Sequence, residues 1–128
     1  MNPVVHFEMP VEDRDRMVNF YSNVFGWECN KMGPEMGNYV VVMTTESDKK
    51  GPLKPGAING GFFPKSVDNP SKYPSVVIQV DDINAHIEKV KSAGGHILGK
   101  PMEIPGVGWY VSFHDTEGNL ISMLQPTS

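Results

Sequence analysis

The chain has little of several features that define specialised classes of protein. It contains one cysteine, Cys29, so an internal disulfide is excluded, and we expect a structural thiol and a reducing, cytoplasmic location. Its longest apolar run, from Tyr39 to Met43, is far shorter than the roughly 20 residues of a membrane-spanning helix. The start of the chain shows no basic stretch followed by an apolar signal core. We therefore expect no secretion signal and no membrane partner.

Positive charge is also scarce. The 11 Lys and Arg residues are outnumbered by 15 Asp and Glu, which leaves a formal net charge of −4, and no basic cluster is present. Because binding to nucleic acid requires a basic face, a nucleic-acid partner is not expected. The 39% hydrophobic and 20% charged shares are typical of a globular chain. A length of 128 residues predicts a single domain spanning residues 1–128.

An internal repeat organises the chain. Residues 6–13 align with residues 75–82 at a constant offset of 69 residues, and each segment is a strand-like run that ends in carboxylates. The same offset pairs Gly26 with Gly95. Each copy therefore predicts a strand, a turn led by aspartate, a helix and a glycine stop.

Hydrophobic periodicity predicts the individual elements. Two opening strands are expected, at Val4 to Pro10 and Val76 to Val80, rich in β-branched residues. Two helical stripes are expected to face a sheet: Met17, Phe20, Tyr21, Val24 and Phe25 in the first copy, and Ile83, Ile87 and Val90 in the second. Further strands are expected at Tyr39–Met43, Ile58–Phe63, Trp109–Phe113 and Leu120–Leu124, with a hairpin turn at Asp115–Asn119.

This order of elements predicts an α+β fold built from two βαβββ modules. Module one spans residues 1–63, module two spans residues 75–126, and a proline-rich connector, residues 64–74, joins them. The segment from Thr44 to Gly56, loaded with Lys, Pro, Gly and Asp, is expected to be a solvated loop within module one. Neither copy could close its own sheet, so the two modules are expected to share one core.

The residues of the first copy resemble the opening of the vicinal oxygen chelate superfamily, which includes glyoxalases, bleomycin-resistance proteins and dioxygenases. The likeness rests on His6, Asp13, the pair Phe20-Tyr21 and the run from Val24 to Trp27. It extends over most of the chain, from Val4 to Leu124. It implies paired βαβββ modules whose curled mixed sheets form a cup that binds ligands or metal, commonly in a homodimer.

The carboxy-terminal half carries two further parts of the resemblance. The segment from Asp115 to Ile121 is similar to the closing hairpin of the superfamily. The stretch from Pro105 to Trp109 is similar to one found in a branch of uncharacterised proteins related to lactoylglutathione lyase.

Metal-binding members of the superfamily place four ligands on the cup floor, and the resemblance locates each position here. His6 matches the first, and Ser75 stands at the second. The third position lies on the segment Ile58–Phe62, which has no carboxylate, and the fourth falls on Ser122. One imidazole cannot hold a divalent ion, which needs several nitrogen or oxygen ligands at about 2.0–2.3 Å. The prediction is a site without metal or another cofactor.

Strand alternation places His6 and Glu8 on one face, opposite Phe7 and Met9. These two residues are the candidates for acid–base work or for hydrogen bonds to a ligand. Gly60 and Gly61 permit close approach by the other module or by a ligand. The residues expected to line the ligand site are His6, Glu8, Phe62, Ser75, Val77, Trp109 and Ser122.

Two main functions follow from these observations. The first is binding or sequestration of a small, partly apolar molecule without metal, with a cationic molecule as one option, as the likeness to bleomycin-resistance proteins implies. The second is a metal-dependent lyase, isomerase or dioxygenase related to lactoylglutathione lyase, in which a divalent metal polarises substrate oxygens. A metal-independent enzyme that uses Glu8 and His6 as base and acid stays open between them.

Overall fold

The computed structural model describes residues 1–127, so Ser128, the last residue of the expected domain, lies outside the described residues. The chain separates into two compact units, His6–Pro74 and a second unit formed by Met1–Val5 with Ser75–Ser128. We call the first the N-terminal unit and the second the C-terminal unit. No helix within residues 1–127 has the length and apolar character needed to cross a bilayer.

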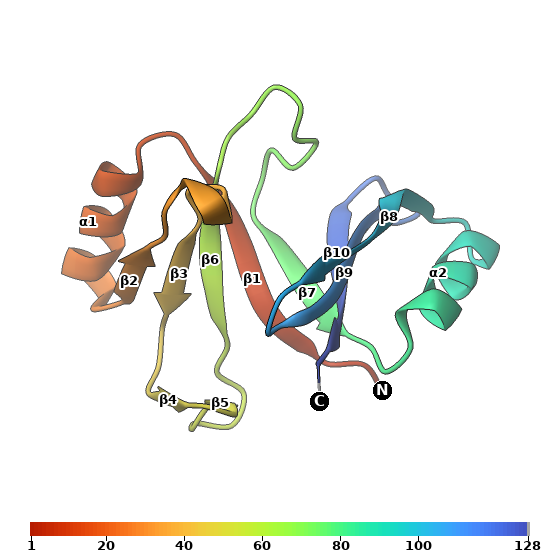
Figure 1. Cartoon of the computed structure of the whole chain (residues 1–128), viewed down its shortest axis with the longest axis horizontal. Helices are drawn as coiled ribbons and strands as arrows, with labels where there is room; N and C mark the ends of the chain where they lie inside the picture. The colour runs from red at the N-terminus through yellow and green to blue at the C-terminus, as the bar shows by residue number, and fades with distance from the viewer. Residues whose placement is uncertain (128) are drawn as a thin grey trace. The chain divides into compact units, whose positions relative to one another are not determined.

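The N-terminal unit packs a helix on a mixed sheet (Figure 1). Its sheet has the order β2-β3-β6-β1, with β6 parallel to β1 and the other neighbours antiparallel. The strand β1 begins at Val4, and its residues from His6 onward belong to this unit. The elements are β1 (Val4–Val11), α1 (Arg14–Phe25), β2 (Glu28–Lys31), the 3₁₀ turn η1 (Pro34–Met36), β3 (Val40–Met43), β4 (Ser47–Asp48), β5 (Gly51–Pro52) and β6 (Asn59–Pro64).

The C-terminal unit repeats this connectivity. Its sheet has the order β7-β10-β9-β8, with β10 parallel to β7 and antiparallel to β9. The elements are β7 (Ser75–Gln79), α2 (Ile83–Ser92), β8 (His96–Ile104), β9 (Gly108–His114) and β10 (Leu120–Pro126). The predicted α+β class with two βαβββ modules is confirmed, and β2 is a strand that the sequence pattern did not predict.

The carboxylates of the repeat cap the two helices. The Asp13 side chain accepts a hydrogen bond from the backbone N–H of Arg16 at 3.1 Å, and the Asp82 side chain accepts one from Ala85 at 3.1 Å. The first helix ends at Gly26, which adopts the left-handed conformation with φ of 74°. The repeat in the sequence therefore corresponds to two equivalent helix starts.

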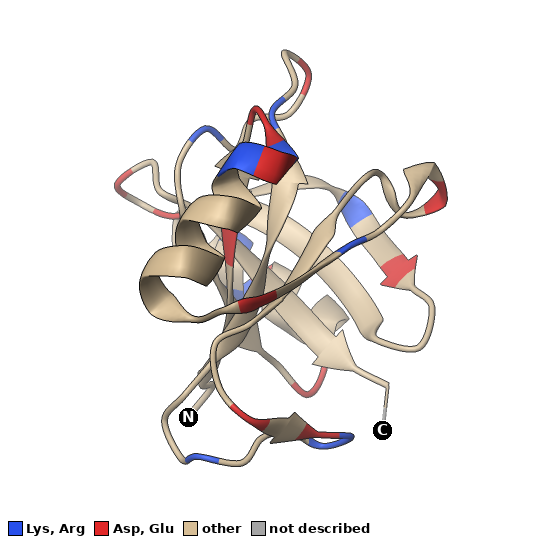
Figure 2. Ribbon diagram, turned by 90° about the vertical axis from the view of Figure 1, so that its left-hand side faces the viewer, with Lys and Arg blue, Asp and Glu red and all other residues tan. Residues whose placement is uncertain are grey.

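The buried face of α1 differs from the prediction. Phe20, Val24 and Phe25 are 55%, 57% and 61% exposed, although they belong to the expected stripe. The rings of Phe20 and Phe25 pack on Tyr21, with centroids 5.0 and 6.0 Å apart, instead of facing the sheet. Figure 2 shows that the charges of α1 are confined to its first turn, so the exposed face of the rest of this helix is uncharged. The residues that face the sheet are Met17, Val18 and Tyr21, against a core of Val11, Val40, Val42 and Phe62.

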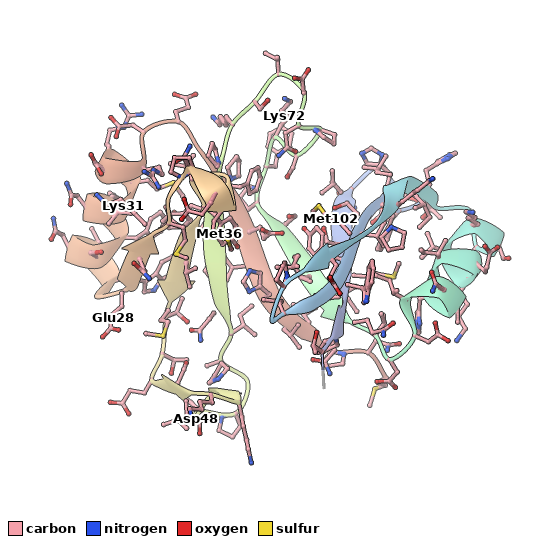
Figure 3. The ribbon with its side chains drawn as sticks, in the orientation of Figure 1. Glu28, Lys31, Met36, Asp48, Lys72 and Met102 are labelled. Carbon is pink, nitrogen blue, oxygen red and sulfur yellow. The ribbon has the colours of Figure 1, made fainter. Side chains whose placement is uncertain are left out.

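The second helix and the insertion follow the sequence more closely. Ile83 and Ile87 of α2 are buried in the core of the C-terminal unit, and Val90 packs against it. The insertion from Thr44 to Gly56 contains the short β4–β5 hairpin, with Asp48, labelled in Figure 3, exposed. A few ladder hydrogen bonds thus form within a segment predicted as loop.

Candidate ligand site around Tyr39

The two faces of β1 have different partners. Phe7 and Met9 pack against the hydrophobic core beneath α1, as alternation predicts. His6 and Glu8 lie on the opposite face, and both are half-buried. A titratable pair is therefore held on the sheet face that does not carry the helix.

Tyr39 bridges this pair. Its hydroxyl donates to Glu8 Oε2 at 3.2 Å and lies 3.1 Å from His6 Nε2. A phenol has one hydrogen, so Tyr39 can donate to only one of these two groups, and the role of His6 Nε2 depends on the tautomer of the ring. The Tyr39 hydroxyl thus joins His6 and Glu8 in one polar group.

Burial governs the protonation of His6. Desolvation of the imidazolium lowers the pKa of His6, and the Glu8 carboxylate raises it by a smaller amount. The net effect is a pKa below the ordinary histidine value, which keeps the ring neutral at pH 7. A neutral ring agrees with one nitrogen donating while the other retains a lone pair.

Gly61 makes room for Tyr39. It pairs with Glu8 across the parallel strands and with Val41 across the antiparallel ones, so it lies on the same face as both. A Cβ atom built at Gly61 would overlap the Tyr39 hydroxyl and ring. The close approach expected at this glycine is therefore made by a side chain of the same unit.

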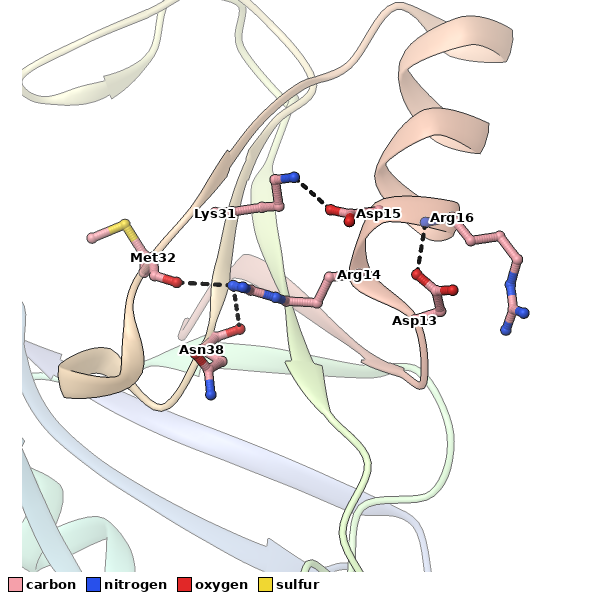
Figure 4. A network of polar contacts seen from close by, with 7 residues as sticks. All are labelled: Asp13, Arg14, Asp15, Arg16, Lys31, Met32 and Asn38. Atoms are coloured by element: carbon pink, nitrogen blue, oxygen red, sulfur yellow. Dashed lines mark hydrogen bonds and ion pairs between the residues drawn. The ribbon is translucent and has the colours of Figure 1, made fainter.

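A polar network anchors the segment before Tyr39 (Figure 4). Nη1 of Arg14 donates to the backbone oxygens of Met32 and Asn38, at 2.8 and 3.1 Å. Asn38 precedes Tyr39 directly and has a φ of 57°, a left-handed conformation that asparagine tolerates better than most residues. Lys31 adds an ion pair to Asp15 of α1. The start of α1 thus fixes the turn that leads into the tyrosine.

The repeat provides an equivalent tyrosine in the C-terminal unit. Val77 occupies the place of Glu8 at the offset of 69 residues, and its partner Ser122 corresponds to Gly61. Ser112 pairs with Ser122 as Val41 pairs with Gly61, so Tyr110 corresponds to Tyr39. Tyr110 donates to Ser122 Oγ at 2.7 Å, and the Ser112 and Ser122 hydroxyls lie 2.8 Å apart. These groups are hydroxyls, whereas Tyr39 contacts an imidazole and a carboxyl group.

The structure separates the other predicted ligand residues. Phe62 pairs with Met9, is 0% exposed and contacts Tyr21, with ring centroids 5.7 Å apart. It belongs to the α1 core, because its register puts it on the other face of the sheet from His6 and Glu8. Trp109 pairs with Gln125, which alternates onto the opposite face of the sheet from Ser122. Its side chain is 41% exposed.

The remaining residues of the predicted set lie in the C-terminal unit. Trp109 shares the α2 face of its sheet with Met123, whereas Ser122 lies on the opposite face. Val77 and Ser122 are 1% and 0% exposed, and Ser75 alternates onto their face. Trp109 and Ser122 therefore face opposite sides of their sheet.

Sequence reasoning missed Tyr39. The sequence pattern predicts it only as the first residue of an apolar strand. The offset of 69 residues places Tyr39 on Gly108 and not on Tyr110, so the equivalence of the two tyrosines follows from strand pairing and no sequence signal points to Tyr39.

The side chains do not fit the divalent metal that the fold family implies. Within residues 1–127, no group of three or more His, Cys, Asp or Glu side chains could hold an ion. Gly61 has no side chain and the Tyr39 ring covers it, while the Ser122 hydroxyl is engaged by Tyr110 and Ser112. Hydroxyl groups thus stand where an ion would need carboxylates.

The fold and the site together define a class. Residues 4–123 match the Glyoxalase/Bleomycin resistance protein/Dioxygenase superfamily, and the chain belongs to it. A glyoxylase-like domain-containing protein from Didymella fabae is 33% identical over 113 residues, which cover 88% of this chain and 84% of the relative.

More distant proteins extend the comparison. Lactoylglutathione lyase GLX1 of Arabidopsis thaliana is 25% identical over 94% of this chain, which spans only 43% of that protein. Among solved structures, methylmalonyl-CoA epimerase from Mycobacterium tuberculosis superposes with a TM-score of 0.69 at 15% identity, covering 98% of this chain and 88% of the epimerase. At that identity the likeness concerns the fold.

Proposed function

We propose that this protein binds a small molecule without a metal ion, at the sheet face that carries His6, Glu8 and Tyr39. The observation that supports this proposal most strongly is the Tyr39 hydroxyl, which bridges the histidine and the carboxylate across Gly61. A partly buried set of polar groups on a rigid strand can orient a ligand through directed hydrogen bonds. No cofactor is required for that role.

Metal analysis tests the absence of a metal. Protein purified without chelator should contain far less than one equivalent of Zn, Ni, Mn or Fe, and EDTA should leave its melting temperature unchanged. Binding linkage would otherwise stabilise the metal-bound form. About one equivalent of metal, together with a lower melting temperature in EDTA, would overturn the proposal.

A second candidate function is a metal-dependent lyase, isomerase or dioxygenase. It is favoured by the relatives that bear the name lactoylglutathione lyase. In that case lactoylglutathione should be turned over when Zn²⁺ or Ni²⁺ is added, and Glu8→Gln should abolish turnover. Turnover in EDTA that is lost in Glu8→Gln and His6→Gln would instead support a metal-independent enzyme with Glu8 as base.

Sequestration of a cationic compound is the form of binding that the bleomycin-resistance proteins in the name of the superfamily suggest. Metal-free bleomycin is the probe for that form, and isothermal titration with and without EDTA should give equal dissociation constants. If bleomycin gives no heat of binding, its sequestration is excluded.

We also propose the cytoplasm as the location, since a lone Cys29 gives no sign of an oxidising compartment.

A further inference from the structure

The sheet face that carries Glu8 also has an exposed apolar part, on β3. Val40 and Val42 of this strand are 0% exposed and belong to the core beneath α1. Val41 and Met43 alternate onto the opposite face and are 40% and 36% exposed. Each of these two side chains therefore keeps an accessible apolar surface that a ligand can contact.

Strand register places this apolar part beside the polar one. Val41 pairs with Gly61, and Gly61 pairs with Glu8 on the next strand, so the three positions form one row across β3, β6 and β1. Neighbouring strands lie about 4.8 Å apart, which puts Val41 about 10 Å from Glu8 along the row. The hydroxyl and ring of Tyr39 cover Gly61 between them. A ligand of that length can therefore contact Val41 with one end and Glu8 with the other.

The charged strand residues of this face have one sign. Besides Glu8 the face carries Glu28, labelled in Figure 3, which pairs with Met43 and is exposed. None of the strand residues on this face, all of which lie within residues 1–127, is Lys or Arg. Lys31 of β2 alternates onto the helix face, where it forms an ion pair with Asp15. The face therefore attracts cations and repels anions.

The histidine of the site does not cancel the charge of Glu8. The Glu8 carboxylate raises the pKa of His6, but burial lowers that pKa by more, so the ring is neutral at pH 7. Glu8 accepts a hydrogen bond from Tyr39. A carboxylate has about four lone-pair positions and accepts from several donors at once, so a ligand ammonium can join the donors that Glu8 already has.

We propose that this face selects compact organic cations, with an amine beside Glu8 and an apolar group about 10 Å away on Val41 and Met43. This inference rests on the proposed function, because it assumes that a small molecule binds at this face. It adds the ligand class, and it names Val41 and Met43 as the residues that determine specificity for the apolar end. Anions, and amines without an apolar group, are disfavoured.

Three probes that share parts of one structure test the ligand class. 4-Phenylbutylamine has both the amine and an apolar ring, 4-phenylbutyrate has a carboxylate in place of the amine, and butylamine lacks the ring. Isothermal titration in EDTA should show that 4-phenylbutylamine binds about tenfold more tightly than either of the other two, because each of them lacks one contact. Equal or tighter binding of 4-phenylbutyrate or butylamine, or no binding of 4-phenylbutylamine, would overturn the ligand class.

Variants of β3 test the apolar end. The double variant Val41→Thr/Met43→Gln replaces apolar surface by polar groups of similar size, so 4-phenylbutylamine should bind about fivefold more weakly. The affinity for butylamine should stay the same. Val24→Thr is the matched control, because this valine is 57% exposed on α1, at the other face of the sheet, and should change neither affinity. Equal losses for the two amines, or no loss in the double variant, would contradict the assigned role of β3.

Variants of the carboxylates test the charged end. Glu8→Gln should weaken 4-phenylbutylamine about tenfold, as expected when a hydrogen bond to a charged group is lost. Glu28→Gln, at an exposed position that no contact of Tyr39 involves, should weaken it about twofold and leaves the bridge intact. If both variants keep the wild-type affinity, the negative charge of the face does not select the ligand.

Nuclear magnetic resonance locates the bound probe. The ring of 4-phenylbutylamine should shift the methyl signals of Val41 and Met43 and leave those of Val24 unchanged. Shifts confined to other methyl groups would place the probe elsewhere and overturn the inference.

The two proposals fail in different ways. Tighter binding of 4-phenylbutyrate in EDTA, with shifts at Val41 and Met43, contradicts the ligand class and leaves metal-free binding standing. One equivalent of bound metal in the purified protein contradicts metal-free binding, whereas the preference among the probes is measured in EDTA and is decided separately.

Discussion

Gly61 matters through the side chain that it lacks. Its place opposite Glu8 and Val41 is covered by the Tyr39 ring, so the bridge from His6 to Glu8 depends on an empty position in the neighbouring strand. A glycine inside a strand weakens the strand, and this one is offset by the hydrogen bonds that it permits.

Gly61→Ala should destabilise the protein by about 1–3 kcal/mol, since the new methyl group overlaps a rigid aromatic ring. The cost should be much smaller when Gly61→Ala is introduced into a Tyr39→Ala background, in which the ring is absent. Urea unfolding of the wild type, both single variants and the double variant measures this coupling. Additive effects of the two substitutions would show that ring overlap is not the cause.

His6 couples the site to pH. Its pKa in the folded protein is lower than the value of 6.5 for an unperturbed histidine, because burial disfavours the imidazolium. The unfolded chain therefore binds a proton before the folded chain does. The His6 contribution to stability is complete above about pH 6.5 and decreases as the pH falls through the pKa of the folded state.

His6→Gln should remove this loss. Unfolding free energies measured by urea titration between about pH 8 and about pH 5 should fall less steeply for the variant than for the wild type. His96→Gln is the matched control, because this histidine is exposed at the start of β8. If the unfolding free energy of His6→Gln falls with pH as steeply as that of the wild type, other groups cause the pH dependence.

At the scale of elements, the local sequence specifies where α1 begins. It does not specify which face of the helix packs on the sheet. The Asp13 cap and Gly26 stop are local features, and the structure has both. The choice of Tyr21 over Phe20 as the residue that faces the sheet depends on stacking with Trp27, at a centroid distance of 4.6 Å, and on contact with Phe62. Both partners lie outside the helix.

Tyr21→Ala should therefore cost about 2–4 kcal/mol of stability, because it removes a ring packed against the core. Phe20→Ala, at the adjacent and 55% exposed position, should cost less than about 1 kcal/mol. Chemical denaturation of the two variants measures the difference. Equal losses would mean that the predicted stripe, with Phe20 inside, describes the buried face after all.

The strands show the same division. Most strand segments follow from β-branched runs, whereas β2, with the sequence Glu-Cys-Asn-Lys, has little apolar character and forms because it pairs with β3. Cys29 of this strand packs against the core, where Ser22 Oγ lies 3.9 Å from its sulfur. Pairing with a neighbour thus overrode weak local preference.

At the scale of the whole molecule, the repeat is the main organising feature. Each unit has the same connectivity and sheet order, and each carries a tyrosine at the same position of that order. The two copies have nevertheless diverged, since one tyrosine joins serines and the other joins a histidine and a glutamate. Duplicated topology therefore coexists with different side chains around the two tyrosines.

We also predict that the chain forms a homodimer, as its superfamily resemblance implies and as twofold pairing makes common among soluble proteins. Sedimentation velocity at micromolar concentration should give a mass near twice the 14.2 kDa of the chain. Tyr39→Phe should leave this mass unchanged, which would separate the site from assembly. A single monomeric species over the whole concentration range would contradict the prediction.

The sequence by itself determined the α+β class, the two modules, the helix caps and the shared face of His6 and Glu8. These features depend on periodicity and capping, which act between residues close in the chain. Tertiary structure decided that Tyr39, 33 residues from His6, completes the site, and that Phe62 joins the core. The physical reason is strand register, because a shift of one residue moves every side chain to the other face, and only pairing between distant strands sets that register.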